Sequence, residues 1–166
     1  MKKLFLKAFA VILAVTSAFA ITANADFAKT KTYTYRVWNS EQPCVFERKF
    51  VYIDSRPVDV DAMSQASADF LGQHDFSAFC ANKNIKKSTE RYIESFVIER
   101  KGEEIVFTVT GNGFLHHMVR IMVGTLLEIG RGERPVNGIP ALFGGNRADA
   151  GELIPACGLC LMEVTY

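Results

Sequence analysis

The sequence lacks an excess of charge of either sign. Its 166 residues hold 19 Lys or Arg and 18 Asp or Glu, and three of the lysines lie within the first 25 residues, which hold no acid. Without those 25 residues the count becomes 16 basic against 18 acidic residues, a balance of −2. The sequence therefore excludes a broadly basic nucleic-acid-binding surface, and any RNA contact has to come from a local patch.

Other scarcities exclude further classes of protein. The chain has only 5 prolines and 12 glycines, it has no internal repeat or low-complexity linker, and 49% of its residues are hydrophobic. These features exclude a disordered tail, a collagen-like repeat and a coiled-coil rod. The length suits one domain with its own core and is too short for two.

The first 25 residues resemble a secretory signal peptide. Lys2 and Lys3 form a basic start, residues 8–22 form an uncharged and mostly apolar run, and residues 23–25 (ANA) have the small-x-small pattern of a cleavage site. The run is shorter than the about 20 apolar residues of a membrane span. We predict a signal-like segment at 1–25, which implies export. The alternative is an apolar segment created by a misplaced gene start or a fusion.

From Lys31 onward the pattern is typical of a globular domain. Alternating residues predict strands at 32–38, 48–53, 91–100, 104–110 and 159–166, and spacings of three and four predict helices at 59–71 and 114–129. Residues 101–103 predict a hairpin turn, and Pro140 with its neighbouring glycines shortens or breaks any helix at 135–146. This order favours an α+β fold with a mixed, mostly antiparallel sheet and helices on one face.

The predicted helix at 114–129 is apolar nearly all round, and its polar residues gather on one side. At 100° per residue, His116, His117, Arg120 and Glu128 fall within a stripe of about 120°. One interpretation is a solvated face with Arg120 stacked over His116. The other is an arginine held at the edge of the core to bind a carboxylate or a phosphate.

Four motifs in the same order carry a resemblance to a known family. They are residues 31–36 (KTYTYR), 71–79 (LGQHDFSAF), 110–126 (TGNGFLHHMVRIMVGTL) and 158–166 (GLCLMEVTY). This combination closely resembles the C-terminal half of the tRNA pseudouridine synthase A family, over residues 28–166. The resemblance implies that this part is half of a pseudouridine synthase catalytic fold.

The family's N-terminal half carries an Arg-Thr-Asp-Ala-Gly motif whose aspartate is catalytic, and no segment of the 166 residues matches it. The segment at 151–155 (GELIP) also departs from the Thr-Ala-Pro that the family usually has before its last strand. The first departure predicts that the lone chain is inactive. The second puts in doubt the loop that leads to Leu159.

By resemblance, family members isomerise uridine to pseudouridine in the anticodon stem-loop of tRNA, without metal or cofactor. Tyr33 matches the tyrosine that stacks on the target uracil and is a candidate base for the final proton removal. Arg120 matches the arginine that pairs with the catalytic aspartate, and Leu159 matches the leucine under the flipped base. A base flipped out of its stack needs an aromatic ring to stack on and an apolar side chain beneath it. An ionised carboxylate in a pocket without water needs a cation beside it.

The resemblance also implies partners. A local basic run is the candidate contact for tRNA phosphates, and it consists of Lys83, Lys86, Lys87 and Arg91. Because the family joins its two halves through one central sheet, half of that sheet exposes a strand edge. We therefore expect either a homodimer or association with the family's other half.

The cysteines offer weaker alternatives. Cys157 and Cys160 form a C-x-x-C pair, but the second cysteine opens a strand, whereas redox pairs of the thioredoxin type open a helix. Cys44 and Cys80 lie far away without paired spacing, so a zinc site is not supported, although export would permit a disulfide between them. Three hypotheses therefore remain: a half-length pseudouridine synthase relative, an exported non-catalytic binding module that keeps the fold, and an exported thiol protein. The first implies the cytoplasm, which conflicts with the export signal.

Overall fold

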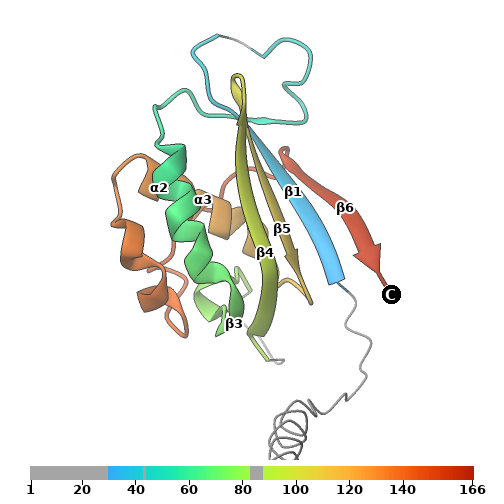
Figure 1. Cartoon of the computed structure of the whole chain (residues 1–166), viewed down its shortest axis with the longest axis vertical. Helices are drawn as coiled ribbons and strands as arrows, with labels where there is room; N and C mark the ends of the chain where they lie inside the picture. Colours follow the sequence, from blue (N-terminus) through green and yellow to red (C-terminus); the bar gives the residue numbers. More distant parts are fainter. Residues whose placement is uncertain (1–29, 43, 83–87) are drawn as a thin grey trace, which may run out of the picture.

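The computed structural model describes residues 30–42, 44–82 and 88–166. The predicted signal-like segment at 1–25 and the basic residues Lys83, Lys86 and Lys87 lie outside these ranges. The strands and helices follow in the order β1 (Thr30–Trp38), β2 (Tyr52–Ile53), α2 (Val60–Ser67), β3 (Gly72–Asp75), β4 (Glu90–Lys101), β5 (Glu104–Gly111), α3 (Met118–Gly130) and β6 (Leu159–Thr165) (Figure 1). Short 3-10 turns lie between them: η1 (Ala68–Phe70), η2 (Ser77–Phe79), η3 (Val136–Gly138) and η4 (Pro140–Leu142).

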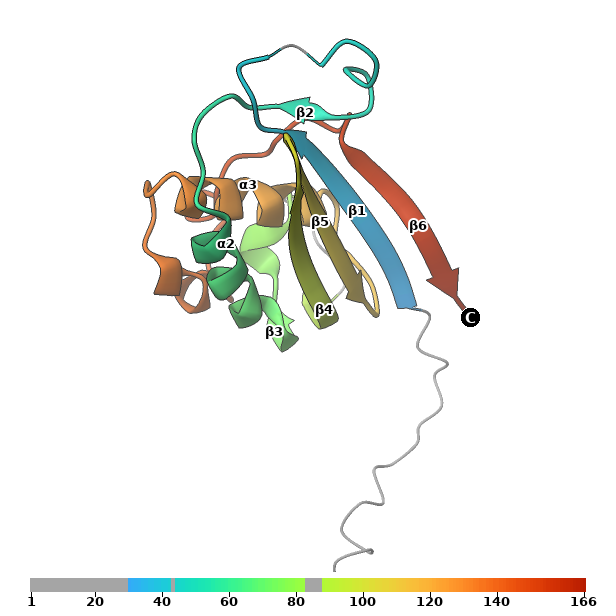
Figure 2. The ribbon, with the colours of Figure 1, turned by 45° about the horizontal axis from the view of Figure 1, so that its top comes forward.

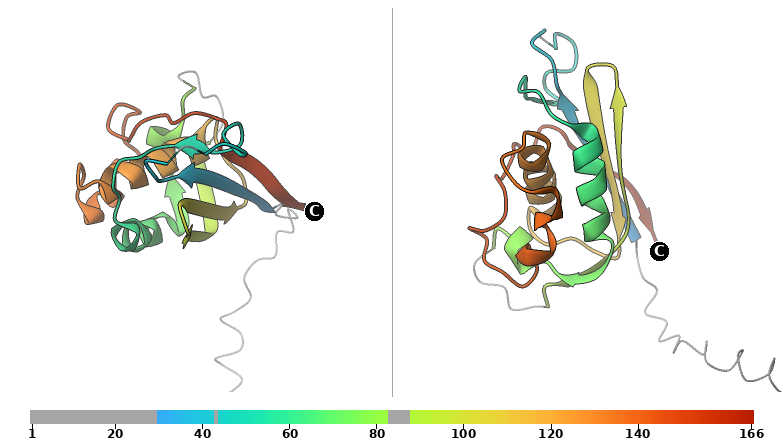
Figure 3. Two further views of the ribbon diagram at one scale, coloured as in Figure 1. Left: turned by 90° about the horizontal axis from the view of Figure 1, so that it is seen from above. Right: turned by 60° about the vertical axis from the view of Figure 1, so that its left-hand side comes forward.

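The strands form one sheet in the order β2-β1-β5-β4-β3, and β6 pairs with β1. Every strand pair is antiparallel except β1 with β2, which pair in parallel over two residues. The helices α2 and α3 lie on one face of this sheet (Figure 3), and β6 is its outermost strand beside β1 (Figure 2). The predicted α+β fold, with its mostly antiparallel sheet and helices on one face, is confirmed.

Strand β1 directs alternate side chains to opposite faces of the sheet, as its sequence predicts. Tyr35 and Val37 are fully buried beneath the helices. Arg36 points to the other face, where its Nη2 donates to Glu104 Oε2 at 2.9 Å. Tyr33 has the same parity as Tyr35, so β1 places it on the face that carries the helices.

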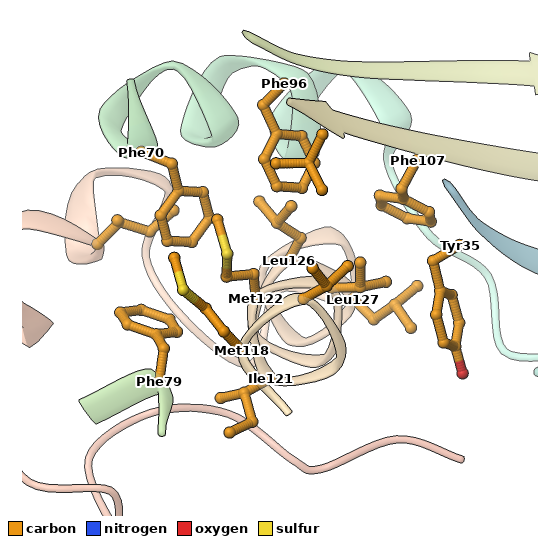
Figure 4. Close-up of a cluster of buried hydrophobic side chains, with 14 of the residues drawn as sticks. Tyr35, Phe70, Phe79, Phe96, Phe107, Met118, Ile121, Met122, Leu126 and Leu127 are labelled. Carbon is orange, nitrogen blue, oxygen red and sulfur yellow. The ribbon is translucent and has the colours of Figure 1, made fainter. Parts of the chain in front are cut away.

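Helix α3 forms the centre of the core. Every one of its residues except Arg120 and Glu128 is buried. Aromatic side chains surround it (Figure 4), and among them the ring of Phe70 meets Phe79 edge-to-face at 5.3 Å and stacks on Phe96 at 5.7 Å. The predicted burial of this helix is confirmed, and it leaves the two charged residues at the margin of the core.

Helix α3 begins at Met118, four residues later than its sequence predicts. His117 has a left-handed backbone with φ 64°, which a right-handed helix does not accommodate. The preceding residues form a turn, closed by the Met118 N–H on the Leu115 carbonyl at 3.1 Å. His116 and His117 therefore do not belong to a helical stripe, and that part of the prediction is wrong.

Two other elements are shorter than predicted. The strand expected at 48–53 is reduced to β2, because the residues before it fold into turns in which the Phe50 N–H meets the Glu47 carbonyl at 2.7 Å. The helix expected at 59–71 begins as predicted, with Asp59 Oδ1 accepting the Ala62 N–H at 3.0 Å. It ends at residue 67, however, and the tighter turn η1 follows, which brings Phe70 into the core.

The remaining local predictions are confirmed. The hairpin turn at 101–103 joins β4 to β5, and Gly102 supplies the left-handed backbone that it needs, with φ 63°. The segment around Pro140 holds no α-helix and forms the 3-10 turns η3 and η4. Both outcomes follow from the backbone conformations that glycine and proline favour, which affect only a few neighbouring residues.

A buried carboxylate joins the loop after β2 to the end of α3. Asp54 is 5% exposed, and Arg56 donates to both of its oxygens, from Nε at 2.8 Å and from Nη2 at 2.7 Å. Arg131, at the end of α3, adds a bond from Nη1 at 3.3 Å. Burial alone would raise the pKa of Asp54, but the hydrogen bonds from Arg56 and the charges of both arginines outweigh burial and hold the pKa below its ordinary value.

We expect Asp54→Asn to lower the free energy of unfolding at pH 7 by about 2 kcal/mol. Breaking a sealed buried ion pair costs about 3–5 kcal/mol, and the cost is smaller here because Arg56 is half exposed and Arg131 keeps Glu133 as a partner. Since folding lowers the pKa of Asp54, its contribution is present above the ordinary carboxyl pKa and is lost as the pH falls through the folded value.

Urea unfolding of the unchanged protein and of Asp54→Asn at pH 7 measures the difference in their free energies of unfolding. The same measurement between pH 4 and pH 3 shows how this difference declines. Glu99→Gln serves as the control, because it breaks an exposed pair with Lys101 and should cost less than about 0.5 kcal/mol. Equal losses in the two variants, or a difference that grows on acidification, would contradict the assignment.

Candidate active site

Arg120 lies in the first turn of α3 and has no carboxylate partner among the described residues. Its Nε donates to the carbonyl of Ile154 at 2.7 Å. Glu128, the acid nearby on the same helix, pairs with Arg134 and accepts the N–H of Glu152 at 2.8 Å. The charge of Arg120 is therefore not neutralised by a carboxylate within the described part of the chain.

The segment at 151–155, here called the crossing segment, passes over α3 and determines where Leu159 lies. At its start the Gly151 N–H donates to Thr125 Oγ1 at 3.0 Å, and at its end Tyr35 Oη donates to the Pro155 carbonyl at 2.5 Å. With the contact of Arg120 in between, the segment is bonded along its length. The loop that leads to Leu159 is therefore held against α3 and β1.

Two glycines allow this close crossing. A Cβ on Gly124 would lie 2.0 Å from the carbonyl oxygen of Glu152, and a Cβ on Gly151 would lie 2.5 Å from the Cα of Thr125. Real Cβ atoms do not approach backbone atoms so closely. The backbones of the helix and of the crossing segment are therefore in direct contact, and this contact holds the site together.

Tyr33 and Leu159 come from neighbouring strands. The Tyr33 ring meets Phe114 edge-to-face, with ring centres 5.1 Å apart. Leu159 is the first residue of β6 and pairs opposite Tyr35 of β1, and its N–H closes a turn on the Ala156 carbonyl at 3.0 Å. Both side chains are half-buried.

Tyr33, Arg120 and Leu159 line a single cavity of about 300 Å³. Its remaining walls are mostly apolar and consist of Phe114, Leu115, His117, Met118, Val119 and Ala156. Such a cavity can hold a flat, uncharged ring between an aromatic and an aliphatic side chain. It can also bring an acid into contact with Arg120.

His117 is the polar cavity residue that the sequence analysis did not select as a site residue. The helical wheel placed it beside Arg120, but a residue at the boundary of a helix does not follow the wheel. Its ring packs on His116 with ring centres 3.7 Å apart. Burial, followed by the nearby His116 and Arg120, lowers the pKa of His117, so its imidazole is neutral at pH 7.

Arg91 is the one predicted phosphate contact within the described ranges. It lies on β4, where its Nη1 donates to the carbonyls of Ser88 at 2.9 Å and Glu90 at 2.5 Å. With Lys31 it lines a polar hollow of about 380 Å³. Phe114 borders both this hollow and the candidate cavity, so the two lie next to each other.

The cysteine alternatives find no support in the described residues. All four cysteines are free thiols, so the disulfide considered between Cys44 and Cys80 is not formed. Cys157 and Cys160 line a separate cavity of about 460 Å³. Within the described ranges, no group of three or more His, Cys, Asp or Glu side chains is placed to hold a metal ion.

No helix among the described residues is long and apolar enough to pass through a bilayer.

Comparison with known proteins identifies the family. A family model described as tRNA pseudouridine synthase matches residues 66–166. The tRNA pseudouridine synthase A of Halalkalibacterium halodurans is 47% identical over 141 residues, which are 81% of this chain and 54% of that protein. The proteins of the same name from Pelobacter propionicus and Anoxybacillus flavithermus are 44% identical over 140 residues and 42% identical over 158 residues. These matches cover 84% and 94% of this chain but only 57% and 64% of the two relatives.

The chain thus spans a little over half the length of these curated relatives. As its motifs predict, it belongs to the tRNA pseudouridine synthase family and corresponds to the C-terminal half of its members.

Proposed function

We propose that this chain supplies the arginine-bearing half of a site that isomerises uridine to pseudouridine in the anticodon stem-loop of tRNA. The N1–C1′ bond of the nucleoside breaks, the detached uracil turns, and C5 bonds to C1′. C5 then loses its proton and N1 carries one, so no atom is gained or lost. The observation that carries the proposal is the meeting of Tyr33, Arg120 and Leu159 in one cavity.

Each of the three residues has a role that suits its surroundings. The Tyr33 ring provides a face on which a flipped base stacks, and its hydroxyl is the candidate group for removing the C5 proton. Leu159 packs under the base and excludes water from it. Arg120 holds the catalytic aspartate in its ionised form, because a nearby cation favours the charged carboxylate.

The aspartate has to come from outside the 166 residues, so the lone chain is inactive in this proposal. The edge of β6 is the place where the family's other half docks. Among the described residues, β6 pairs only with β1, and its side chains Leu161 and Met162 are 49% and 60% exposed. An apolar, unpaired strand edge invites pairing with another chain.

The contact with tRNA extends from the cavity toward Arg91. The polar hollow of Lys31 and Arg91 adjoins the cavity at Phe114, and basic side chains there suit the phosphates that flank a flipped nucleotide. Because the sequence holds nearly equal numbers of basic and acidic residues, 19 against 18, RNA contact depends on such a local patch.

Complementation tests the proposal. The 166-residue chain is combined with an N-terminal segment of a family member that carries the Arg-Thr-Asp-Ala-Gly motif, and pseudouridine in tRNA is measured by mass spectrometry. We expect activity only with both parts present, and loss of activity with Tyr33→Phe or with the motif's aspartate changed to asparagine. The absence of pseudouridine despite a stable complex would instead favour the non-catalytic binding module.

The free edge of β6 predicts self-association when the other half is absent. We expect the 166-residue chain to elute in size-exclusion chromatography above its monomer mass of 18.5 kDa and to become monomeric with Met162→Lys, because an edge lysine opposes strand pairing. Tyr92→Lys is the matched control, since Tyr92 is similarly exposed but lies in the part of β4 that is bonded on both sides, to Gln73 of β3 and to the N–H of Asn112. A monomer at all concentrations would contradict this prediction.

A further inference from the structure

His117 is the only non-glycine residue within the described ranges with a positive φ. The left-handed conformation is unfavourable for histidine because its Cβ approaches the following carbonyl. The side chain does not offset this by capping α3, since it makes no hydrogen bond to the start of the helix. The start of the helix therefore does not explain why a histidine occupies this position.

The same residue holds a second unfavourable feature. His117 Nδ1 is the buried side-chain nitrogen that has no hydrogen-bond partner among the described residues. Buried polar atoms are nearly always paired, so an unpaired one requires an explanation such as a ligand or a catalytic role. Strain and an unpaired polar atom at one residue are typical of a functional site.

The ring presents one defined donor to the cavity. Partial burial of the ring, followed by the nearby His116 and Arg120, lowers the pKa of His117 and so favours the neutral imidazole. A neutral imidazole carries its proton on either nitrogen, and placing the proton on Nε2 avoids burying an unpaired N–H at Nδ1. Since the ring lines the cavity while Nδ1 is buried, Nε2–H is the group that a ligand reaches.

Among the side chains that line the cavity, only Tyr33, His117 and Arg120 carry nitrogen or oxygen atoms. Tyr33 provides the stacking face, and Arg120 is bonded to the Ile154 carbonyl and holds the aspartate in the proposed function. His117 is therefore the polar side chain that remains to read the edge of a base. A base taken into an apolar pocket has polar atoms that need partners there.

We infer that His117 determines base specificity in this cavity: its imidazole donates a hydrogen bond from Nε2 to the C4 carbonyl oxygen of uracil, and so selects uracil over cytosine. Cytosine carries an amino group at C4, and two N–H donors facing each other in a dry pocket leave both unpaired. This inference rests on the proposed function in that it takes the cavity to be the pocket of the target base.

Nuclear magnetic resonance of the imidazole groups tests the inference directly. The chain has only three histidines, so the ¹⁵N signals of His117 can be assigned with His74→Asn and His116→Asn variants. Uridine 5′-monophosphate is expected to shift the His117 signals saturably. Cytidine 5′-monophosphate is expected to do so at least about tenfold more weakly. Equal responses to the two nucleotides, or no saturable response to the uridine nucleotide, would overturn the inference.

Variants separate recognition from structure. His117→Gly removes the ring and relieves the positive φ, so we expect it to fold with unchanged or higher thermal stability and to bind the two nucleotides with less than about threefold preference. His117→Asn, which tolerates the same backbone but is shorter, gives a second test if the glycine variant folds poorly. His74→Asn, on β3 and outside the cavity lining, should keep the preference. A preference retained in both His117 variants would overturn the assignment.

The complementation assay distinguishes this inference from the proposed function. If uridine 5′-monophosphate shifts the His117 signals more strongly than the cytidine nucleotide, but no pseudouridine forms with the other half present, the base-reading role of His117 stands and the proposed isomerase activity fails. If pseudouridine forms and His117→Gly neither lowers its rate nor admits the cytidine nucleotide, the isomerase stands and the role of His117 fails.

Discussion

Arg120→Ala is expected to reduce pseudouridine formation by the complemented protein by about 10²–10³-fold, the range observed when one charged or hydrogen-bonding group is removed from a preorganised site. The guanidinium lies in the cavity wall, and no carboxylate of the described chain pairs with it. Without it the incoming aspartate enters an apolar pocket alone, where its pKa rises and its ionised form is lost. The measurement is the single-turnover rate of pseudouridine formation with saturating tRNA.

The same substitution should change stability little, because the only bond lost from the described chain is the one to the Ile154 carbonyl, worth about 1 kcal/mol. Arg134→Ala is the control: Arg134 also pairs with the helix, through Glu128, but does not line the cavity. We expect it to keep the rate within about threefold of the unchanged protein. A rate unaffected by Arg120→Ala would exclude the assignment of this cavity as the active site.

The fold was predictable from the sequence wherever local chemistry decides the structure. The alternation of β1 and the burial of α3 each follow from a pattern of apolar residues within a single element. Gly102 in the hairpin turn and Asp59 at the start of α2 satisfy local backbone requirements that involve only three or four residues. The start of α2 and the hairpin turn therefore lie where the sequence predicts them, whereas the end of α2 and the start of α3 each differ by four residues.

Other features depend on contacts that a sequence does not display. The segment at 48–53 has strand-like residues, but only two of them reach β1, and the others fold into turns. The left-handed backbone at His117 starts α3 later than periodicity predicts, because periodicity does not detect a single reversed φ. In both places tertiary structure overrode the local pattern.

The candidate site could be predicted in part. Tyr33, Arg120 and Leu159 could be selected as site residues only through the family motifs. A tyrosine or leucine in a strand is by itself most often a packing residue. Their meeting in one cavity depends on the crossing segment, whose bonds to α3 join residues far apart in the sequence. No periodicity contains that information, so the sequence could not show that these residues meet.

Gly124→Ala is expected to destabilise the fold by at least about 3 kcal/mol, at the upper end of the range for overpacked cores. Helix propensity alone predicts the opposite sign, since alanine in the middle of a helix is favoured over glycine by about 1 kcal/mol. The added Cβ, however, would lie 2.0 Å from the Glu152 carbonyl oxygen, and a backbone atom cannot rotate away as a side chain can. The crossing segment has to move off α3 instead.

Urea unfolding followed through Trp38, the single tryptophan, measures this effect in the full chain. Gly113→Ala is the matched control, because its Cβ would meet only the Arg91 side chain, at 3.5 Å, and should change stability by less than about 0.5 kcal/mol. A displaced crossing segment also takes the Ile154 carbonyl away from Arg120 and shifts Leu159. The variant should therefore lose complemented activity even under conditions in which it remains folded. If the Gly124→Ala protein is as stable as the original, α3 and the crossing segment are not in contact as described. The description of the cavity, which depends on this contact, would then be wrong as well.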